Sequence, residues 1–216
     1  MMLYKRNQVE EAIFRTLGAR DERVKEVRFR IKRLLAADRR MADPSSARIG
    51  TRQYAFFDQE PPGSGNEVLF SGYEAFALLA AVILLEHGLP QATVVRVMRD
   101  VRGPFALAHA DILKKDPASL FNEAALIAQA KPGMIAVGST QPVFLVFIRL
   151  TASSASDVDG GSAIAVCRSA EELMRFIKRH SVPGSGASYF EFAGLMHTLA
   201  ANLSQTRPKK RGRGAA

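Results

Sequence analysis

The feature that most constrains this fold is a segment that is apolar on nearly every side. Residues 73–87 read YEAFALLAAVILLEH, with charged side chains only near the two ends. Ser71 and Glu74 have the spacing of a capping box and Gly88 follows the segment, so the sequence predicts a helix between them. A helix that is apolar all round must be covered on every side, which predicts either a central core helix or an interface between two copies.

Two helices are expected before this segment. Asn7 and Glu10 have the spacing of an N-cap and N3 pair, and Gly18 is placed to end the helix that they begin. A second helix is expected over residues 21–38, where apolar residues recur at helical spacing and can face a core. That apolar stripe consists of Val24, Val27, Ile31, Leu34 and Leu35.

Between the second helix and the apolar segment, the sequence favours two short strands. Tyr54–Phe57 and Val68–Phe70 are rich in aromatic and branched residues, and a Pro/Gly/Ser/Asn run lies between them. Such a run forms a turn or a loop tip, so the pattern predicts a β-hairpin.

The remainder of the chain changes from a helical to a mixed pattern. Helical patterns come first: a helix over 91–102, helical turns between Pro104 and Lys115, and a segment capped by Asp116 that ends at 131–133. Strands are then expected near 134–137, 143–150 and 163–167. Two helices follow, one from the capping box Ser169–Glu172 to His180 and one capped by Ser188–Glu191 that ends near 204. The last two strands predict an antiparallel hairpin joined by a long loop.

These elements predict an α+β chain with a boundary near Pro132. We expect a mainly helical, winged-helix-like domain over 1–132 and a smaller mixed α/β domain with an antiparallel hairpin over 133–205. The last stretch, 206–216, has no apolar anchor and is expected to be a disordered basic tail.

The charge is concentrated at the two ends. The chain of 216 residues carries 30 Lys and Arg against 21 Asp and Glu, a net charge of +9. Residues 1–52 contribute +7 and residues 207–216 contribute +5, whereas the stretch between them carries −3. Basic residues that only solubilise a surface are expected to be spread evenly, so this distribution favours an anionic partner, nucleic acid above all.

The candidate nucleic-acid-binding side chains follow from this charge map. The helix over 21–38 places basic side chains on the face opposite its apolar stripe, where they can contact phosphates and base edges. The candidates are Lys25, Arg28, Lys32, Arg33, Arg39 and Arg40 on this helix and its end, and Lys209, Lys210, Arg211 and Arg213 in the tail. The alternative is a solvated helix face on which Glu22 and Glu26 pair with basic residues at helical spacing.

The tail resembles an AT-hook in its core Arg211-Gly212-Arg213, although Gly214 replaces the proline that usually follows. The resemblance implies contact with nucleic acid, and we expect an arm that binds phosphates without reading sequence.

No enzyme, metal or cofactor motif is found by spacing. Gly63-Ser64-Gly65 and Gly184-Ser185-Gly186 lack the strand–glycine–helix context of a dinucleotide-binding loop. The four histidines are scattered, and the single cysteine, Cys167, sits in an apolar run. We therefore expect a non-enzymatic protein without metal or cofactor. We also expect a cytoplasmic protein that does not enter a membrane, because we find no secretory signal and the apolar segment is too short to span a bilayer.

Over about the first hundred residues, the chain resembles the MerR-type winged helix-turn-helix regulators. In that family a wing is followed by a segment that begins with Tyr or Phe and then by a helix–glycine–helix pair; here the matching stretches are Phe70–Tyr73 and Leu85–Pro90. The resemblance implies a bacterial-type transcriptional regulator that binds duplex DNA through the basic helix and the hairpin wing. We also expect a homodimer held partly by the helix over 73–87, because two copies on paired half-sites multiply a modest individual specificity. A protein-interaction or oligomerisation module and an RNA-binding protein remain the alternatives.

Overall fold

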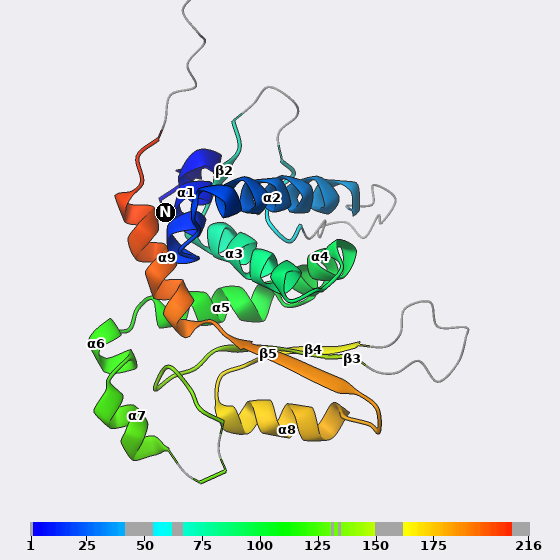
Figure 1. Cartoon of the computed structure of the whole chain (residues 1–216), viewed down its shortest axis with the longest axis vertical. Coiled ribbons are helices and arrows are strands. Elements are labelled where there is room, and N and C mark those ends of the chain that lie inside the picture. Colours follow the sequence, from blue (N-terminus) through cyan, green and yellow to red (C-terminus); the bar gives the residue numbers. More distant parts are fainter. Residues whose placement is uncertain are drawn as a thin grey trace, which may run out of the picture. The chain divides into compact units, whose positions relative to one another are not determined.

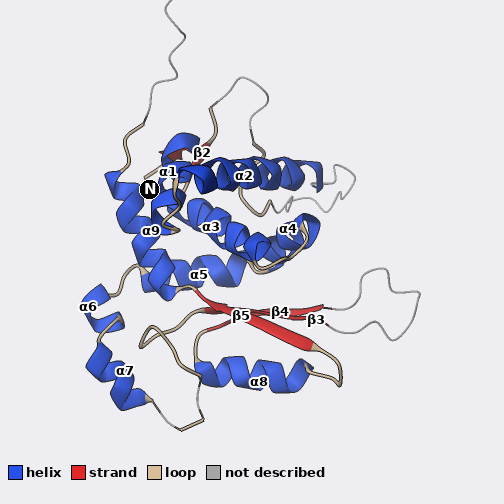
Figure 2. Cartoon of the chain, in the orientation of Figure 1, coloured by secondary structure: helices blue, strands red, loops and turns tan. Residues whose placement is uncertain are grey.

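The computed structural model of the chain describes residues 2–41, 54–61, 67–130, 132–133, 135–149 and 162–208 (Figure 1). These residues form an α+β fold in which helices accompany two small antiparallel sheets (Figure 2). The chain divides into two compact units: unit 1 contains Met1–Arg99 and Thr198–Ala216, and unit 2 contains Asp100–His197. The boundary that the sequence predicts near Pro132 lies inside unit 2 in this division.

Unit 1 is built around α3. Its elements are β1 (Tyr4–Lys5), α1 (Arg6–Thr16), α2 (Asp21–Met41), β2 (Leu69–Phe70), α3 (Gly72–Glu86), all but the last residue of α4 (Gln91–Asp100), and the larger part of α9 (Ala193–Gln205). Helices α1 and α2 and strand β2 pack against α3, and residues 75–82 are at most 1% exposed. The apolar segment is therefore a core helix of unit 1.

The predicted ends of α3 are confirmed. The Glu74 N–H donates to Ser71 Oγ at 3.2 Å, and the Ser71 N–H donates to Glu74 Oε2 at 2.6 Å, which forms the capping box. Gly88 follows the helix with φ of 84°, a left-handed conformation that glycine adopts without a steric penalty. Two unsatisfied donors at the helix start thus receive partners from within the sequence itself.

The predicted wing hairpin is wrong. Residues 54–57 form no strand, and Leu69–Phe70 pairs antiparallel with Tyr4–Lys5. The backbone N–H groups of Ala55 and Phe56 donate instead to the carboxylate of Asp38, at 3.1 and 3.0 Å. A buried side chain therefore satisfies the donors that a hairpin partner would have taken.

The start of α1 also differs from the prediction. The helix begins at Arg6, so Lys5 is the N-cap and Asn7 lies within the first turn. The pairing of β1 with β2 holds the chain extended as far as Lys5, and the Gln8 side chain accepts the Lys5 N–H at 3.1 Å. The predicted stop is confirmed, because Gly18 has φ of 58° directly after the helix.

Unit 2 is a three-stranded sheet with helices. Its elements are α5 (Arg102–Ile112), α6 (Pro117–Leu120), α7 (Glu123–Gln129), β3 (Phe144–Arg149), β4 (Ser162–Cys167), α8 (Ala170–His180), β5 (Gly186–Glu191) and the first turn of α9. The strand order is β4-β3-β5 with both pairs antiparallel, so the predicted hairpin of β3 and β4 is confirmed. Figure 2 shows α8 along the sheet, and Leu173 of α8 packs with Phe144, Val146 and Ile148.

Three predictions for unit 2 are corrected. Ser188–Glu191 caps no helix; it lies in β5, because β-forming Tyr189 and Phe190 pair with the free side of β3. The Glu191 carboxylate accepts the Gly138 N–H at 2.7 Å, so it bonds to a loop and not to the first turn of a helix. The helical turns expected from Pro104 begin earlier, at Arg102, so Pro104 lies in the first turn of α5, where its missing N–H costs no hydrogen bond. Residues 135–137 form no strand.

Candidate nucleic-acid interface

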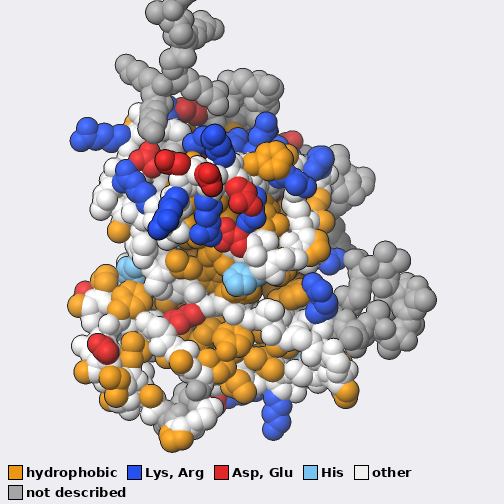
Figure 3. Space-filling model, in the orientation of Figure 1, with side chains coloured by type: hydrophobic (Ala, Val, Ile, Leu, Met, Phe, Trp, Pro, Cys, Tyr) orange, Lys and Arg blue, Asp and Glu red, His pale blue; other side chains and the backbone are white. Residues whose placement is uncertain are grey.

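Helix α2 presents a basic face. Its inner stripe of Val27, Ile31 and Leu34 is at most 1% exposed, which fixes the rotation of the helix and turns the opposite side outward. We define the basic face as Lys25, Arg28, Phe29, Lys32, Arg33, Arg39 and Arg40, all of which are exposed. Figure 3 shows Lys and Arg side chains gathered over the region of α1 and α2, with acidic side chains among them. The predicted helical candidates thus share one face.

Acidic neighbours bind part of this basic surface. The Arg28 Nε lies 3.1 Å from Glu10 Oε2, and the Arg6 Nε lies 2.7 Å from Glu10 Oε1. One carboxylate of α1 therefore serves two guanidinium groups. Beside the basic face, Arg30 pairs with both Glu26 and Glu86. An ion pair at helical spacing, which the sequence indicates as the alternative, therefore forms between Glu26 and Arg30. Neither of these residues is a candidate for nucleic-acid binding.

The rest of the basic face carries unneutralised charge. Among the residues that the structure describes, Lys25, Lys32, Arg33, Arg39 and Arg40 have no carboxylate within ion-pair distance. Two of these guanidinium groups lie on aromatic rings: Arg33 is 5.6 Å from the Phe29 ring centroid and Arg39 is 5.4 Å from that of Phe57. Stacking restrains a guanidinium while its N–H groups stay available to an anion.

Asp38 is the one acidic residue of α2 after Glu26, and it is fully buried. Its Oδ1 accepts from the Arg99 Nε at 2.9 Å and the Arg99 Nη2 at 2.7 Å, and its carboxylate also accepts the two N–H groups of residues 55 and 56. Arg99 further donates to the backbone oxygens of Asp38 and Met41. The outer face of residues 28–41 therefore displays no carboxylate.

Sequence reasoning missed this network, although a signal for it exists. Asp38 continues the spacing of the buried stripe from Ile31 and Leu34, so its side chain had to point inward. A buried carboxylate needs a cation and hydrogen-bond donors. The sequence does not reveal that Arg99 and the segment after residue 53 supply them.

The candidate residues of the tail, Lys209, Lys210, Arg211 and Arg213, lie outside the described residues. At the first residue of the predicted tail, the structure shows a polar contact to α1. Thr206 is 7% exposed, and its carbonyl oxygen accepts from Gln8 Nε2 at 3.1 Å. This contact attaches the beginning of the tail to α1 within unit 1.

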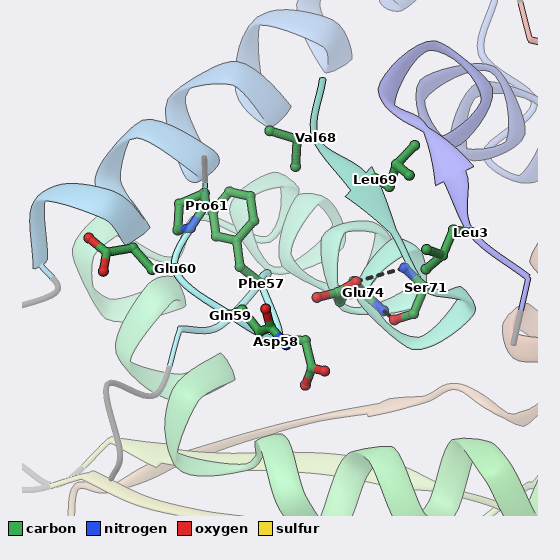
Figure 4. Close-up of a pocket in the computed structure, with 10 residues that line it drawn as sticks. All are labelled: Leu3, Phe57, Asp58, Gln59, Glu60, Pro61, Val68, Leu69, Ser71 and Glu74. Atoms are coloured by element: carbon green, nitrogen blue, oxygen red, sulfur yellow. Dashed lines mark hydrogen bonds between the residues drawn. The ribbon is translucent and has the colours of Figure 1, made fainter. Parts of the chain in front are cut away.

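A pocket of unit 1 has an apolar and acidic lining, unlike the basic face of α2. Figure 4 shows it beside β2, with the capping-box pair Ser71 and Glu74 on one wall. Apolar side chains, including Leu3 and Phe57, line it together with the carboxylates of Asp58 and Glu60, and its volume is about 300 Å³. Carboxylates in the lining repel phosphates, so this pocket is not an extension of the basic face.

Titratable groups of unit 2 are perturbed by burial. Desolvation, assisted by the charge of His197, lowers the pKa of His109 to about 4. Burial, assisted by Glu172, raises the pKa of the Cys167 thiol to about 11, which leaves this thiol protonated at neutral pH. The His197 Nε2 is 3.0 Å from the Ile112 carbonyl oxygen. Within the described ranges, no three His, Cys, Asp or Glu side chains gather in a metal-binding cluster.

We expect the burial of His109 to make the protein less stable in acid. The unfolded chain, with a His pKa near 6.5, binds more protons than the folded chain between about pH 6.5 and 4. The contribution of neutral His109 is therefore complete above pH 6.5 and is lost as the pH falls to 4, by about 3 kcal/mol. Denaturant unfolding at several pH values measures it. His109→Gln should flatten the pH dependence, whereas the same change at exposed His87 should not; equal slopes for both variants contradict the assignment.

No family model, curated protein or solved structure matches this chain. Of the helices in the described part of the chain, none has both the length and the apolar character needed to cross a membrane.

Proposed function

We propose that the chain binds duplex DNA, as a transcriptional regulator of the bacterial type, through the basic face of α2. The observation that carries the proposal is the asymmetry of this helix: between residues 28 and 41 its only carboxylate is buried against Arg99, while its basic side chains other than Arg30 are exposed. A helix fits the major groove, where basic side chains reach phosphates on both walls. The hairpin wing has no part in this proposal.

Within the proposal, the basic residues have different tasks. Lys32, Arg33 and Arg40 neutralise phosphates and fix the position of the helix on the duplex. Arg28 is held by Glu10 and so has a defined direction, which suits contact with a base edge. The basic tail adds affinity for all sequences alike.

We expect binding to duplex DNA to weaken steeply with salt. Each phosphate that the protein neutralises contributes about 0.9 to the log–log slope, so five or more contacts give a slope of roughly −4 or steeper. Fluorescence anisotropy with a labelled duplex, titrated between about 50 and 200 mM salt, measures this slope. A flat salt response, or no binding at the lowest salt concentration, would refute the proposal.

A second candidate function is binding of single-stranded nucleic acid, RNA included. Phe29 is 57% exposed in the middle of the basic face, and the Arg33 guanidinium lies on its ring. An exposed ring beside cations is what unpaired bases stack on. Phe29→Ala distinguishes the two functions: it should weaken binding to a single strand much more than binding to a duplex of the same length. Competition between duplex DNA and RNA then identifies the preferred partner.

A further inference from the structure

Strand β5 is an edge strand whose outer side is unoccupied in the described part of the chain. The sheet order β4-β3-β5 gives β5 one neighbour, and Gly186–Tyr189 are exposed. An edge strand carries a row of backbone donors and acceptors that can pair with another strand.

The ladder shows which backbone groups of β5 face outward. The Phe192 N–H donates to the Val143 carbonyl oxygen at 2.8 Å, and these two residues continue the register of β3 and β5. Residues of an antiparallel strand alternate between facing their partner and facing away. Phe190 and Ser188 therefore face β3 like Phe192, and the N–H and C=O groups of residues 187, 189 and 191 point outward.

The outer side of β5 lacks the devices that usually protect an edge. The strand reads GASYFE, with no lysine, arginine or proline and with one charged residue, Glu191, at its end. Natural edges are commonly blocked by lysine, proline or a bulge. Tyr189 instead leaves 42% of its surface exposed beside this row of outward-facing backbone groups.

We propose that two copies of the chain pair antiparallel through β5, with Tyr189 on the twofold axis. In this register Tyr189 opposes Tyr189 of the second copy, and Ala187 opposes Glu191 at each end. The residues whose backbone groups face outward thus meet one another, which is the condition for a hydrogen-bonded antiparallel pair. The two sheets then become one continuous sheet, and a twofold axis is the commonest symmetry of protein dimers.

The charge of the strand selects the antiparallel direction. Parallel pairing places the two Glu191 side chains side by side, and like charges directly opposite each other destabilise a sheet. Antiparallel pairing in the proposed register separates them by four residues along the strand, or about 14 Å. This separation exceeds the screening length of about 8 Å in physiological salt. The two tyrosines also form an aromatic cross-strand pair, which adds stability.

The pairing goes beyond the proposed function and needs no nucleic acid, so its test uses the full-length protein alone. Sedimentation over a dilution series should give a dimer, twice the 23.6 kDa of one chain, that dissociates on dilution. Tyr189→Lys places like charges on the axis and should raise the dissociation constant about tenfold or more. Tyr189→Phe keeps the ring and is the matched control, with little change expected.

Oxidative cross-linking provides a second readout. Opposed residues of a hydrogen-bonded pair have Cα atoms about 5.5 Å apart, within the range that a disulfide spans. Tyr189→Cys should therefore cross-link into a dimer under mild oxidation, and Glu171→Cys on exposed α8 should not. Native Cys167 is buried and protonated, so it leaves the readout clear.

Three results would overturn the proposal. The first is a protein that stays monomeric at the highest concentration tested. The second is a dimer that persists in the Tyr189→Lys variant, together with cross-linking of the Tyr189→Cys variant that is no better than that of Glu171→Cys. This result would place the dimer interface elsewhere. The third is slow hydrogen exchange at the amides of 187, 189 and 191 in the monomer, which means that another segment of the same chain covers β5.

Discussion

Replacing Asp38 with alanine is expected to lower the free energy of unfolding by about 3–5 kcal/mol, because it leaves a charged partner without compensation. The side chain of Arg99 is 18% exposed and would lose both of its bonds to the carboxylate. The N–H groups of Ala55 and Phe56 would lose their acceptor at the same time. Denaturant unfolding of wild type and variant measures the loss.

Two further variants show whether the buried charge is the cause. Glu26→Ala removes a carboxylate that is exposed and pairs with Arg30 on the same helix, so it should change stability by at most about 0.5 kcal/mol. Arg99→Met in the Asp38→Ala background removes the uncompensated charge and should restore part of the stability. A loss below about 1 kcal/mol for Asp38→Ala would contradict the importance of this network.

The second large effect is expected for DNA binding. Reversing three charges of the basic face, with Lys32→Glu, Arg33→Glu and Arg40→Glu combined, should weaken duplex binding about 100-fold or more near 0.1 M salt. Each lost phosphate contact should also make the salt slope shallower by about 0.9. These three side chains are exposed and have no carboxylate partner among the described residues, so the variant should fold normally.

A matched control separates a local site from net charge. Arg175→Glu, Lys178→Glu and Arg179→Glu on α8 reverse three exposed charges of unit 2 and change the net charge by the same amount. We expect this variant to bind DNA within a few-fold of wild type, at an unchanged salt slope. Equal losses in the two variants would mean that binding depends on net charge and that α2 holds no special site.

Local signals were read correctly where the bonds involved are local. Two local signals predicted helix starts: the capping box Ser71–Glu74 for α3 and the N-cap Ser169 for α8. In both, donor and acceptor lie within one turn of each other. The same motif at Ser188–Glu191 misled, because two aromatic β-formers stand inside it and β3 had an open side. Local spacing cannot decide between a helix start and a strand when a distant strand offers hydrogen bonds.

The sequence by itself determined that α3 is a helix that must be covered on every side, because its residues are apolar all round. It also determined the inward stripe of α2, and hence which side of α2 is basic, from the periodicity of apolar residues. Tertiary structure alone decided the partners: β2 pairs with β1, Asp38 meets Arg99, and Glu10 reaches Arg28. The physical reason is that each of these contacts joins residues far apart in the chain, and no property of a short segment specifies them. The same holds for β5, whose open edge exists only because β3 lies in the middle of the sheet.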